Sequence, residues 1–266
     1  MRHDNETLTL ALNSAEGVLQ LVLGRISSNG GCEMLAETSL AAASRGAELL
    51  TPELNKMLRE HGVAARDIQR VACVRGPGGF TGIRLGLATA LGIAGACGAM
   101  LAGLDYLPLL AANAFAVRKK QTAQNKNAAW AILHARRNEV VLQGFNREPT
   151  PITPALALSP ADAARMMREH GIPLSVFGSG LLRNAREIEE VFPEAAPSFL
   201  LEDLTRLSPE SLLKAASSAV YSLNPIEPLY VRPCDAEQNL PDIAKNMGWN
   251  PDEAVRRLAD LTRSRV

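Results

Sequence analysis

The sequence predicts an internally duplicated α/β fold with two subdomains, each built from a mixed sheet flanked by helices. Two observations support this prediction. An order of strand, turn, strand, strand, helix, strand and helix fills the first part of the chain and begins again near residue 129. At the centre of the first pass, four glycines and a proline within seven residues separate a buried strand from a helix. No repeated sequence accompanies the repeated order, so the duplication rests on the order of elements alone.

The first half begins with two apolar segments around the turn Asn13 to Gly17, which is typical of a β-hairpin. A weaker third strand follows, and then a helix whose apolar residues recur on one face. The expected elements are strands at 7–12, 18–23 and 32–39, a helix at 45–61, a strand at 71–74, a helix from 83 onward capped by Thr81, and a strand at 100–103.

The second half is expected to repeat that order after a helix at 107–117 and a solvated polar loop at 118–127. Serine followed by proline predicts two helix starts, at Ser159 and at Ser208. The expected elements are strands at 129–133, 139–145 and 173–177, helices at 160–170, 181–191 and 209–223, and an extended segment at 228–232.

These elements predict three parts: a first subdomain at 1–105, a second at 106–232, and a C-terminal extension at 233–266. The helix at 209–223 can pack back on the first subdomain. In the extension, Asn250 is expected to cap a last helix that Pro251 opens, with Glu253 at the capping-box position.

The composition argues against several functional classes. Lys+Arg and Asp+Glu are equal at 28 each, so no overall field recruits nucleic acid or a membrane surface. Only 4% of residues are aromatic, which disfavours stacking platforms for single-stranded RNA. Four cysteines without a C-x-x-C pair suit a reducing cytosol and argue against a zinc site. The N-terminus lacks a signal-peptide pattern, and the apolar run 83–104 is interpreted as a buried helix of a soluble protein.

A glycine-rich motif loop, followed by an arginine, is the first candidate site. It consists of Gly76, Pro77, Gly78, Gly79, Phe80, Thr81 and Gly82, with Arg84 just beyond. It is not a Walker A loop, because no Lys-Ser/Thr follows, and Thr81 stands where G-x-G-x-x-G needs its third glycine. Two interpretations stay open: a backbone cradle for an anion at a helix N-terminus, or a rigid turn that shapes the helix start.

The helix after this loop carries a stripe with almost no side-chain bulk. Its members recur every fourth residue: Gly82, Gly86, Ala90, Ala94 and Gly98. An interior helical glycine costs about 1 kcal/mol relative to alanine, so the stripe indicates close approach by another backbone or helix. Leucine and isoleucine flank the stripe and leave almost no polar face. The helix is therefore expected to be covered on every side, by its own fold or by a partner.

Duplicated folds of this order in the actin, sugar-kinase and heat-shock ATPase (ASKHA, ribonuclease H-like) group place an acid at the first strand turn of each half, where it holds Mg²⁺. Here the corresponding turns carry Asn13 and His134, and neither is a carboxylate. The nearby acids Glu16 and Glu139 are interpreted as solvated turn residues. No HExxH pair occurs, and Ser179 is not part of a GxSxG elbow. The sequence therefore predicts that phosphoryl chemistry, metal and cofactor are absent.

The stretch GPGGFTGIRLGLATALGIA resembles the hallmark of the TsaB (YeaZ) family, a GPGSFTGxRxG run after a buried strand. Further segments that resemble the family are LALNSAEGVLQLVL, LLTPELNKML, LDYLPLL, AILHARRNEVVLQGF and PLYVR, so the likeness covers about residues 8–232. The chain departs from the family where Asn13 and His134 replace aspartates, Gly46-Ala47 replace His-Ser and Gly79 replaces serine. The tail after residue 232 has no clear counterpart.

The resemblance implies a cytoplasmic, non-catalytic subunit with an actin-like fold. Family members pair with the enzyme TsaD through helices of their first domain. With the ATPase TsaE, that pair moves a threonylcarbamoyl group from its adenylate to the tRNA adenosine beside the anticodon, so the subunit meets tRNA only indirectly. On this basis the partner interface is predicted at Leu50, Leu54, Met57, Leu58, Leu85, Gly86, Thr89, Ala90, Ile93 and Ala94.

Three other functions stay open. An active ATPase or sugar kinase of the same fold would hydrolyse nucleotide with Mg²⁺, which Asn13 and His134 argue against. A peptidase would need a nucleophile or metal set that the sequence does not provide. A homodimer with a regulatory role could form when the partner is absent, because a two-fold contact needs only a self-complementary patch.

Overall fold

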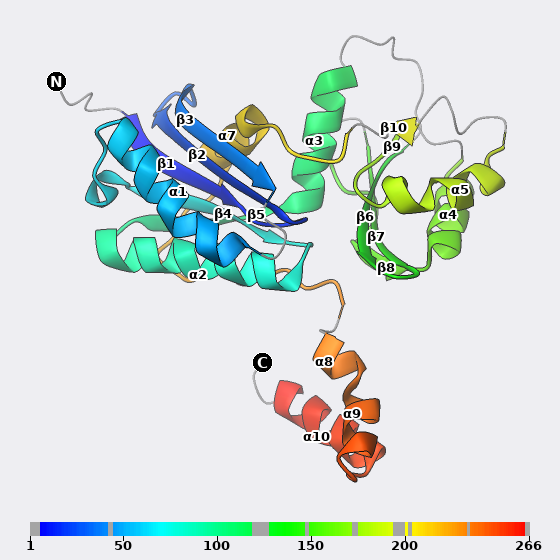
Figure 1. Ribbon diagram of the computed structural model, residues 1–266. Helices are drawn as coiled ribbons and strands as arrows, with labels where there is room; N and C mark the ends of the chain where they lie inside the picture. Colours follow the sequence, from blue (N-terminus) through cyan, green and yellow to red (C-terminus); the bar gives the residue numbers. More distant parts are fainter. Residues whose placement is uncertain are drawn as a thin grey trace. The chain divides into compact units, whose positions relative to one another are not determined.

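The structure is a computed structural model of the 266-residue chain. It describes residues 6–41, 45–118, 128–146, 149–171, 175–193, 200–201, 204–232 and 235–263. The chain divides into two compact units, Met1–Val231 and Arg232–Val266. The larger unit contains both sheets (Figure 1).

The first sheet has five strands in the order β3-β2-β1-β4-β5. β1 pairs antiparallel with β2 and parallel with β4, while β3 and β5 extend the sheet antiparallel and parallel respectively. The strands are β1 (Glu6–Asn13), β2 (Val18–Ser27), β3 (Cys32–Ala41), β4 (Arg70–Gly76) and β5 (Met100–Asp105).

The second sheet repeats this arrangement strand for strand. Its order is β10-β9-β6-β7-β8, with β6 in the place of β1, antiparallel to β7 and parallel to β9. The strands are β6 (Ala129–Arg136), β7 (Glu139–Phe145), β8 (Leu156–Leu158), β9 (Ser175–Phe177) and β10 (Leu200–Leu201). The predicted fold class is confirmed: this is a duplicated, actin-like fold with ribonuclease H-like sheets.

Helices cover both faces of the first sheet (Figure 1). Because strand side chains alternate between faces, Leu10 and Leu12 join one core and Ala11 joins another. The helices α1 (Gly46–Glu60) and α2 (Phe80–Cys97) close the core that contains Leu10 and Leu12. The helices α3 (Tyr106–Arg118) and α7 (Pro209–Ser218) close the other core.

The second sheet shares that other core. One face of β6 and β7, with Ala131 and Phe145, packs in the same cluster as Ala11 and Leu213, so the two halves meet around α3 and α7. The opposite face, with the fully buried Trp130, is covered by α4 (Pro160–Glu169) and α5 (Leu181–Val191). A single apolar core therefore lies between the two halves. The turn after β1 and the turn after β6 both lie next to this core, at the junction of the halves.

Most element predictions agree with the structure, and several differ. The strands β8 and β10 were not expected; with three and two residues they are too short to show a period-2 pattern. Thr81 does not cap α2, because the helix begins one residue earlier, after an extended Gly79. The helix expected at 209–223 ends at Ser218, where Ala219 turns extended. The predicted loop at 118–127 lies almost entirely outside the described residues.

The smaller unit contains three short helices, α8 (Asp235–Gln238), α9 (Leu240–Asn246) and α10 (Pro251–Arg263). The predicted cap of α10 is present: the Oδ1 atom of Asn250 accepts hydrogen bonds from the amides of Asp252 and Glu253. α8 and α9 were not expected.

Candidate functional site

The turn after β1 is closed by its own asparagine. Asn13 is buried, its Nδ2 donates to Oε1 of Gln20 at 2.6 Å, and its Oδ1 accepts from the amide of Ala15 at 3.0 Å. Both ends of the side-chain amide therefore hold the hairpin in shape. An oxygen engaged in this way is a poor ligand for a hard cation.

The equivalent turn after β6 carries His134. Its Nε2 lies 3.0 Å from Nη1 of Arg183, at the start of α5. Burial, and then the charge of Arg183, lower the pKa of His134, so the neutral imidazole accepts the guanidinium's hydrogen bond. A guanidinium beside the ring also repels a metal cation. In the described ranges, no group of three or more His, Cys, Asp or Glu side chains could hold a metal ion.

A partly buried pair of hydrogen bonds at Ser179 joins the two turns. The hydroxyl of Ser179 donates to Oε2 of Glu16 and accepts from the backbone amide of His134 at 3.1 Å. Burial raises the pKa of the Glu16 carboxyl, and the Ser179 hydrogen bond partly offsets this. The interpretation of Glu16 as a solvated turn residue was therefore wrong, because the side chain faces the junction between the halves. Glu139 is also largely covered and pairs with Arg136 at 2.9 Å.

These contacts bear on the peptidase alternative. Ser179 is bonded to a carboxylate and to a main-chain amide, whereas the ring of His134 is engaged with Arg183. A serine nucleophile needs an adjacent base that takes its proton, and that base is usually an imidazole. The arrangement at Ser179 links two turns and does not reproduce such a pair.

The motif loop is filled by the chain's own first turn. A Cβ on Gly78 would lie 2.8 Å from the Cβ of Ala15, and one on Gly82 would collide with the carbonyl oxygen of Ser14. In return, the Ser14 hydroxyl donates to the carbonyl of Gly82 at 2.7 Å. The glycines are thus needed for close approach of protein to protein. Of the two interpretations left open by the sequence, this packing favours the rigid turn.

The other end of the loop is also occupied. Gly76 adopts φ +123°, a conformation that favours glycine, and the carbonyl oxygen of Leu229 lies where its side chain would be. Pro77 is buried behind it, and the peptide bond between the two is cis. Gly79 stays open, with nothing within 4 Å of its Cβ position.

The small-residue stripe of α2 faces the protein's own sheet. Gly86, Ala90 and Ala94 are buried, and a Cβ on Gly86 would meet the Ser14 hydroxyl and lie 3.3 Å from Sγ of Cys73. The close neighbour that the stripe indicated is therefore this chain's own β1–β2 turn and β4. The protein's own fold covers only one side of the helix, so complete coverage, as the sequence predicts, would need a partner on the other side.

The predicted interface residues are mostly inside the fold. Seven of them are buried and so are not available at the surface as this chain is folded: Leu50, Leu54, Met57, Leu58, Gly86, Ala90 and Ala94. The other three, Leu85, Thr89 and Ile93, are half-buried. The Thr89 hydroxyl bonds back to the carbonyl of Leu85 at 2.9 Å. The apolar residues at regular helical spacing belong to the core.

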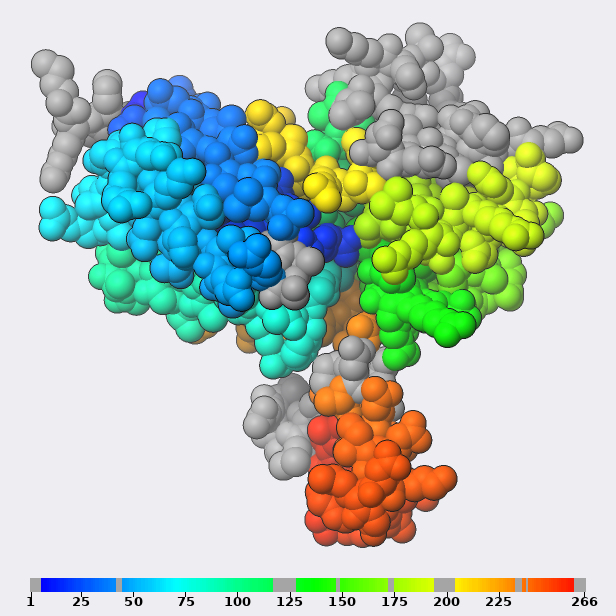
Figure 2. Space-filling view, viewed as in Figure 1, coloured from blue at the N-terminus to red at the C-terminus, as the bar shows by residue number. Residues whose placement is uncertain are grey.

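The outward side of α2 was missed by sequence reasoning. Its exposed residues are Ala88, Leu91, Gly92, Gly95 and Ala96. We call these five residues the outer face of α2. Leu91 is 49% exposed, and nothing lies within 4 Å of the Cβ positions of Gly92 and Gly95. Figure 2 shows α2 at the surface of the larger unit, beside α1. A second helix could approach this face closely, because it has few side chains in the way.

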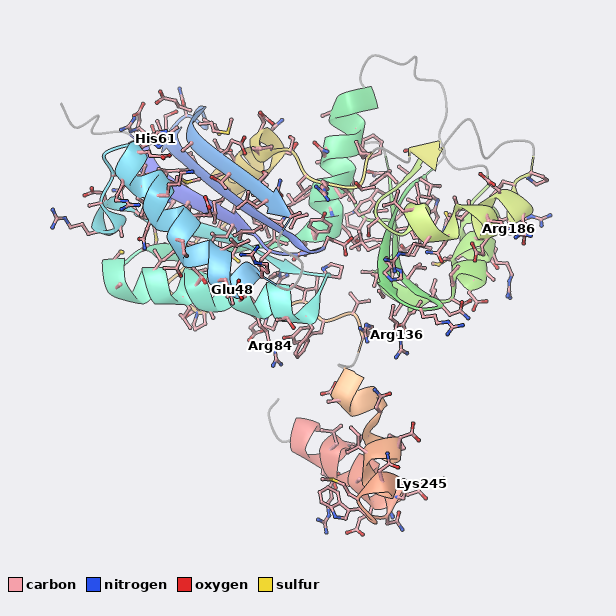
Figure 3. The ribbon with its side chains drawn as sticks, in the orientation of Figure 1. Glu48, His61, Arg84, Arg136, Arg186 and Lys245 are labelled. Carbon is pink, nitrogen blue, oxygen red and sulfur yellow. The ribbon has the colours of Figure 1, made fainter. Side chains whose placement is uncertain are left out.

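Arg84 stands at the N-terminal end of this face and points away from the first sheet (Figure 3). Its Nε donates to the hydroxyl of Tyr230 at 2.9 Å, and its guanidinium carbon lies 3.8 Å from the centroid of the Phe80 ring. The two rings stack with centroids 5.4 Å apart. The motif-loop residues Phe80 and Arg84 thus hold the end of the larger unit's chain against the start of α2.

Among the described helices, α2 alone is long and apolar enough to cross a membrane. Its buried side packs on β1, β4 and β5 of its own sheet and on α1. It is a core helix of this fold with one uncovered side.

Comparisons with known proteins agree with this architecture. The family model of TsaD, tRNA N6-adenosine threonylcarbamoyltransferase, matches residues 40–173, half of the chain. The crystal structure of an uncharacterised Pseudomonas aeruginosa protein, described as similar to peptidase YeaZ, has 22% identity and a TM-score of 0.64, and the match covers 85% of this chain and 100% of that one. YeaZ from Pseudomonas aeruginosa gives 22% identity and a TM-score of 0.60 over 84% and 99% of the two chains. At these identities the two structures show likeness of fold.

Proposed function

The chain belongs to the TsaD family, and from that premise we propose that it is a non-catalytic, TsaB-type subunit. It pairs with a TsaD enzyme in the cytoplasm and supports transfer of a threonylcarbamoyl group from its adenylate to the tRNA adenosine beside the anticodon. TsaE joins the larger complex, and the subunit itself needs no cofactor.

The observation that carries this proposal is the filled motif loop. Phosphoryl-transfer enzymes need open space and hard-cation ligands around the phosphates. Here Ala15 fills the space against Gly78, and Ser14 fills the space against Gly82. The side-chain amide of Asn13 is hydrogen-bonded within its own hairpin. An amide and a guanidinium-bound imidazole replace the two carboxylates. A scaffold in this state supports docking better than nucleotide chemistry.

The surface proposed for docking is the outer face of α2, not the buried stripe. Leu91 supplies exposed apolar area, and Gly92 and Gly95 allow a partner helix to come close. Uncovered apolar surface of this kind on a soluble fold marks an interaction site. Of the interface residues expected from the sequence, the half-buried Leu85, Thr89 and Ile93 can contribute only at the edges.

Reconstitution tests the proposal. The transferase of the same organism is supplied with threonylcarbamoyl-adenylate and tRNA, with and without this chain, and modified adenosine is measured. We expect product only when the chain is present, and no ATP hydrolysis by the chain alone with Mg²⁺. ATP turnover by the isolated chain, or a transferase indifferent to its omission, would contradict the proposal.

A further inference from the structure

Residues 219–231, which we call the strap, run extended from the end of α7 along the edge of β5. Ser222 and Leu101 exchange two main-chain hydrogen bonds, at 2.7 and 2.9 Å. Further along, the amide of Leu229 donates to the carbonyl of Arg75 at 2.8 Å. The strap is thus fixed by backbone bonds at two points, and Tyr230 reaches the start of α2. The strap therefore forms one side of the space next to α2.

A groove of about 290 Å³ lies between α2 and the strap. We call it the strap groove. Its lining consists of Arg84, Leu87, Ala88 and Leu91 from α2, Leu101 from β5, and Pro225, Ile226, Pro228 and Tyr230 from the strap. This volume lies at the lower limit of small-molecule sites, which span roughly 300–1,000 Å³. It suits one or two apolar side chains. Leu223, also on the strap, is 78% exposed.

The groove has one charged lining residue, and it is a cation. Phe80 and Tyr230 fix the guanidinium of Arg84 through the stack and the 2.9 Å hydrogen bond. In the part of the chain that the structure describes, no carboxylate lies within ion-pair distance of it. An oriented guanidinium without an acidic partner is suited to bind a carboxylate from outside.

We propose that the strap groove receives an apolar anchor side chain of the TsaD-family partner, and that a carboxylate next to that anchor pairs with Arg84. This inference rests on the proposed function and adds the strap to the surface involved. The anchor enters between Ala88 and Pro225, and the carboxylate meets the guanidinium beside Tyr230.

Charge favours such a partner over a second copy of this chain. α2 contains no aspartate or glutamate, so α2 of a second copy offers Arg84 no carboxylate. The strap's acidic residue, Glu227, already interacts electrostatically with Arg75 of its own chain. An α2–α2 pairing would therefore leave Arg84 without an acidic partner, whereas a partner that supplies a carboxylate would satisfy it.

The dissociation constant of the complex with the TsaD-family enzyme tests the inference, measured by calorimetry at low and high salt. Arg84→Glu should weaken binding on the order of tenfold or more, because it sets two carboxylates against each other. Arg84→Lys keeps the charge but loses the stacked guanidinium, so it should weaken binding less than Arg84→Glu does. Ala88→Trp, which fills the groove, should also weaken binding. The matched control is Arg137→Glu, an exposed arginine of the β6–β7 turn, which should leave binding unchanged. Thermal unfolding confirms that each variant is folded.

A suppressor identifies the contact directly. Acid-to-lysine changes in the partner, tested one at a time against Arg84→Glu, should include one that restores binding. If Arg84→Glu and Ala88→Trp both bind like wild type while Gly95→Glu, on the outer face but outside the groove lining, does not, the strap groove is unused and this inference is overturned, although the proposed function stands. If Arg84→Glu alters only self-association of the chain, the occupant is a second copy and the inference is likewise overturned. If wild type itself does not bind, the proposed function fails first.

Discussion

The two sides of α2 are built from similar small residues and have opposite surroundings. On the inner side, Gly86 and Ala90 leave no space between the helix and its sheet, and Gly82 sits against Ser14. On the outer side, Gly92 and Gly95 face open space, next to an exposed Leu91. A small residue is thus required on one side by a neighbour that is present. On the other side it leaves open space, which no part of the described chain fills.

This difference separates the side of α2 that packs within the fold from the side that we propose for docking. A glycine in a helix interior lowers helix stability. The inner glycines Gly82 and Gly86 compensate for this, because they allow close contact with the β1–β2 turn. Among the described residues, no atom lies within 4 Å of the Cβ positions of the outer glycines Gly92 and Gly95. We attribute them to a partner helix, which makes the outer face the functional side of α2.

The largest expected effect comes from placing a leucine on each side of α2 in turn. Gly86→Leu would force a side chain into Ser14 and Cys73, and should lower the free energy of unfolding by about 3 kcal/mol or more, or prevent folding. Gly92→Leu is the matched control and should not lower the free energy of unfolding, because the position faces open space. Chemical denaturation measures both. Equal losses for the two variants would show that the outer side is covered as well.

A smaller effect on stability, which depends on pH, is expected at the β1–β2 turn, against which the inner side of α2 packs. Glu16 has a pKa raised in the folded state, mainly by burial, above its ordinary value of 4.5. Its stability contribution is therefore fully present below that value and is lost as the pH rises through the folded-state pKa. Relative to Glu16→Gln, wild type should become less stable between about pH 4.5 and neutral pH.

Ser179→Ala sharpens this test. It removes the hydrogen bond that lowers the pKa of Glu16, so the loss of stability with rising pH should increase. Thermal unfolding across the pH range measures the three proteins. Parallel pH profiles for wild type and Glu16→Gln would contradict a buried carboxylate at the junction.

The smallest expected effect is a gain. Gly92→Ala adds a methyl group in open space on a helix interior and should raise the free energy of unfolding by about 0.5–1 kcal/mol. Gly86→Ala makes the same substitution on the inner side, where the added methyl group meets Ser14. It should therefore not raise the free energy of unfolding. Denaturant titration resolves the pair, and a loss at Gly92 would mean that this position is already packed.

Much of the fold followed from the sequence because its local signals agree with the global arrangement. The hairpin turn Asn13 to Gly17 and the caps Ser159, Ser208 and Asn250 all stand where expected. The sequence did not predict which side of α2 faces the core. Its single charged residue, Arg84, and its near-uniform apolar composition give no polar stripe to orient the helix.

The site was only half predictable for a related reason. Asn13 and His134 show from sequence that carboxylates are missing. The packing that fills the motif loop, however, joins Ser14 to Gly82 across 68 residues, and Glu16 meets Ser179 across 163. Local patterns carry no information about such distant contacts. The same holds for the strap, whose Tyr230 reaches Arg84 only in the folded chain.

One measurement tests the central claim most directly: the dissociation constant of this chain with the TsaD-family enzyme, for Leu91→Glu and for Leu182→Glu. Both leucines are exposed on helices, Leu91 on α2 at 49% and Leu182 on α5 at 68%. A charge on the outer face of α2 should weaken the complex by roughly a hundredfold, as expected for a central apolar contact, while the same change on α5 leaves affinity unchanged. Equal affinity for both variants and wild type would contradict docking through α2.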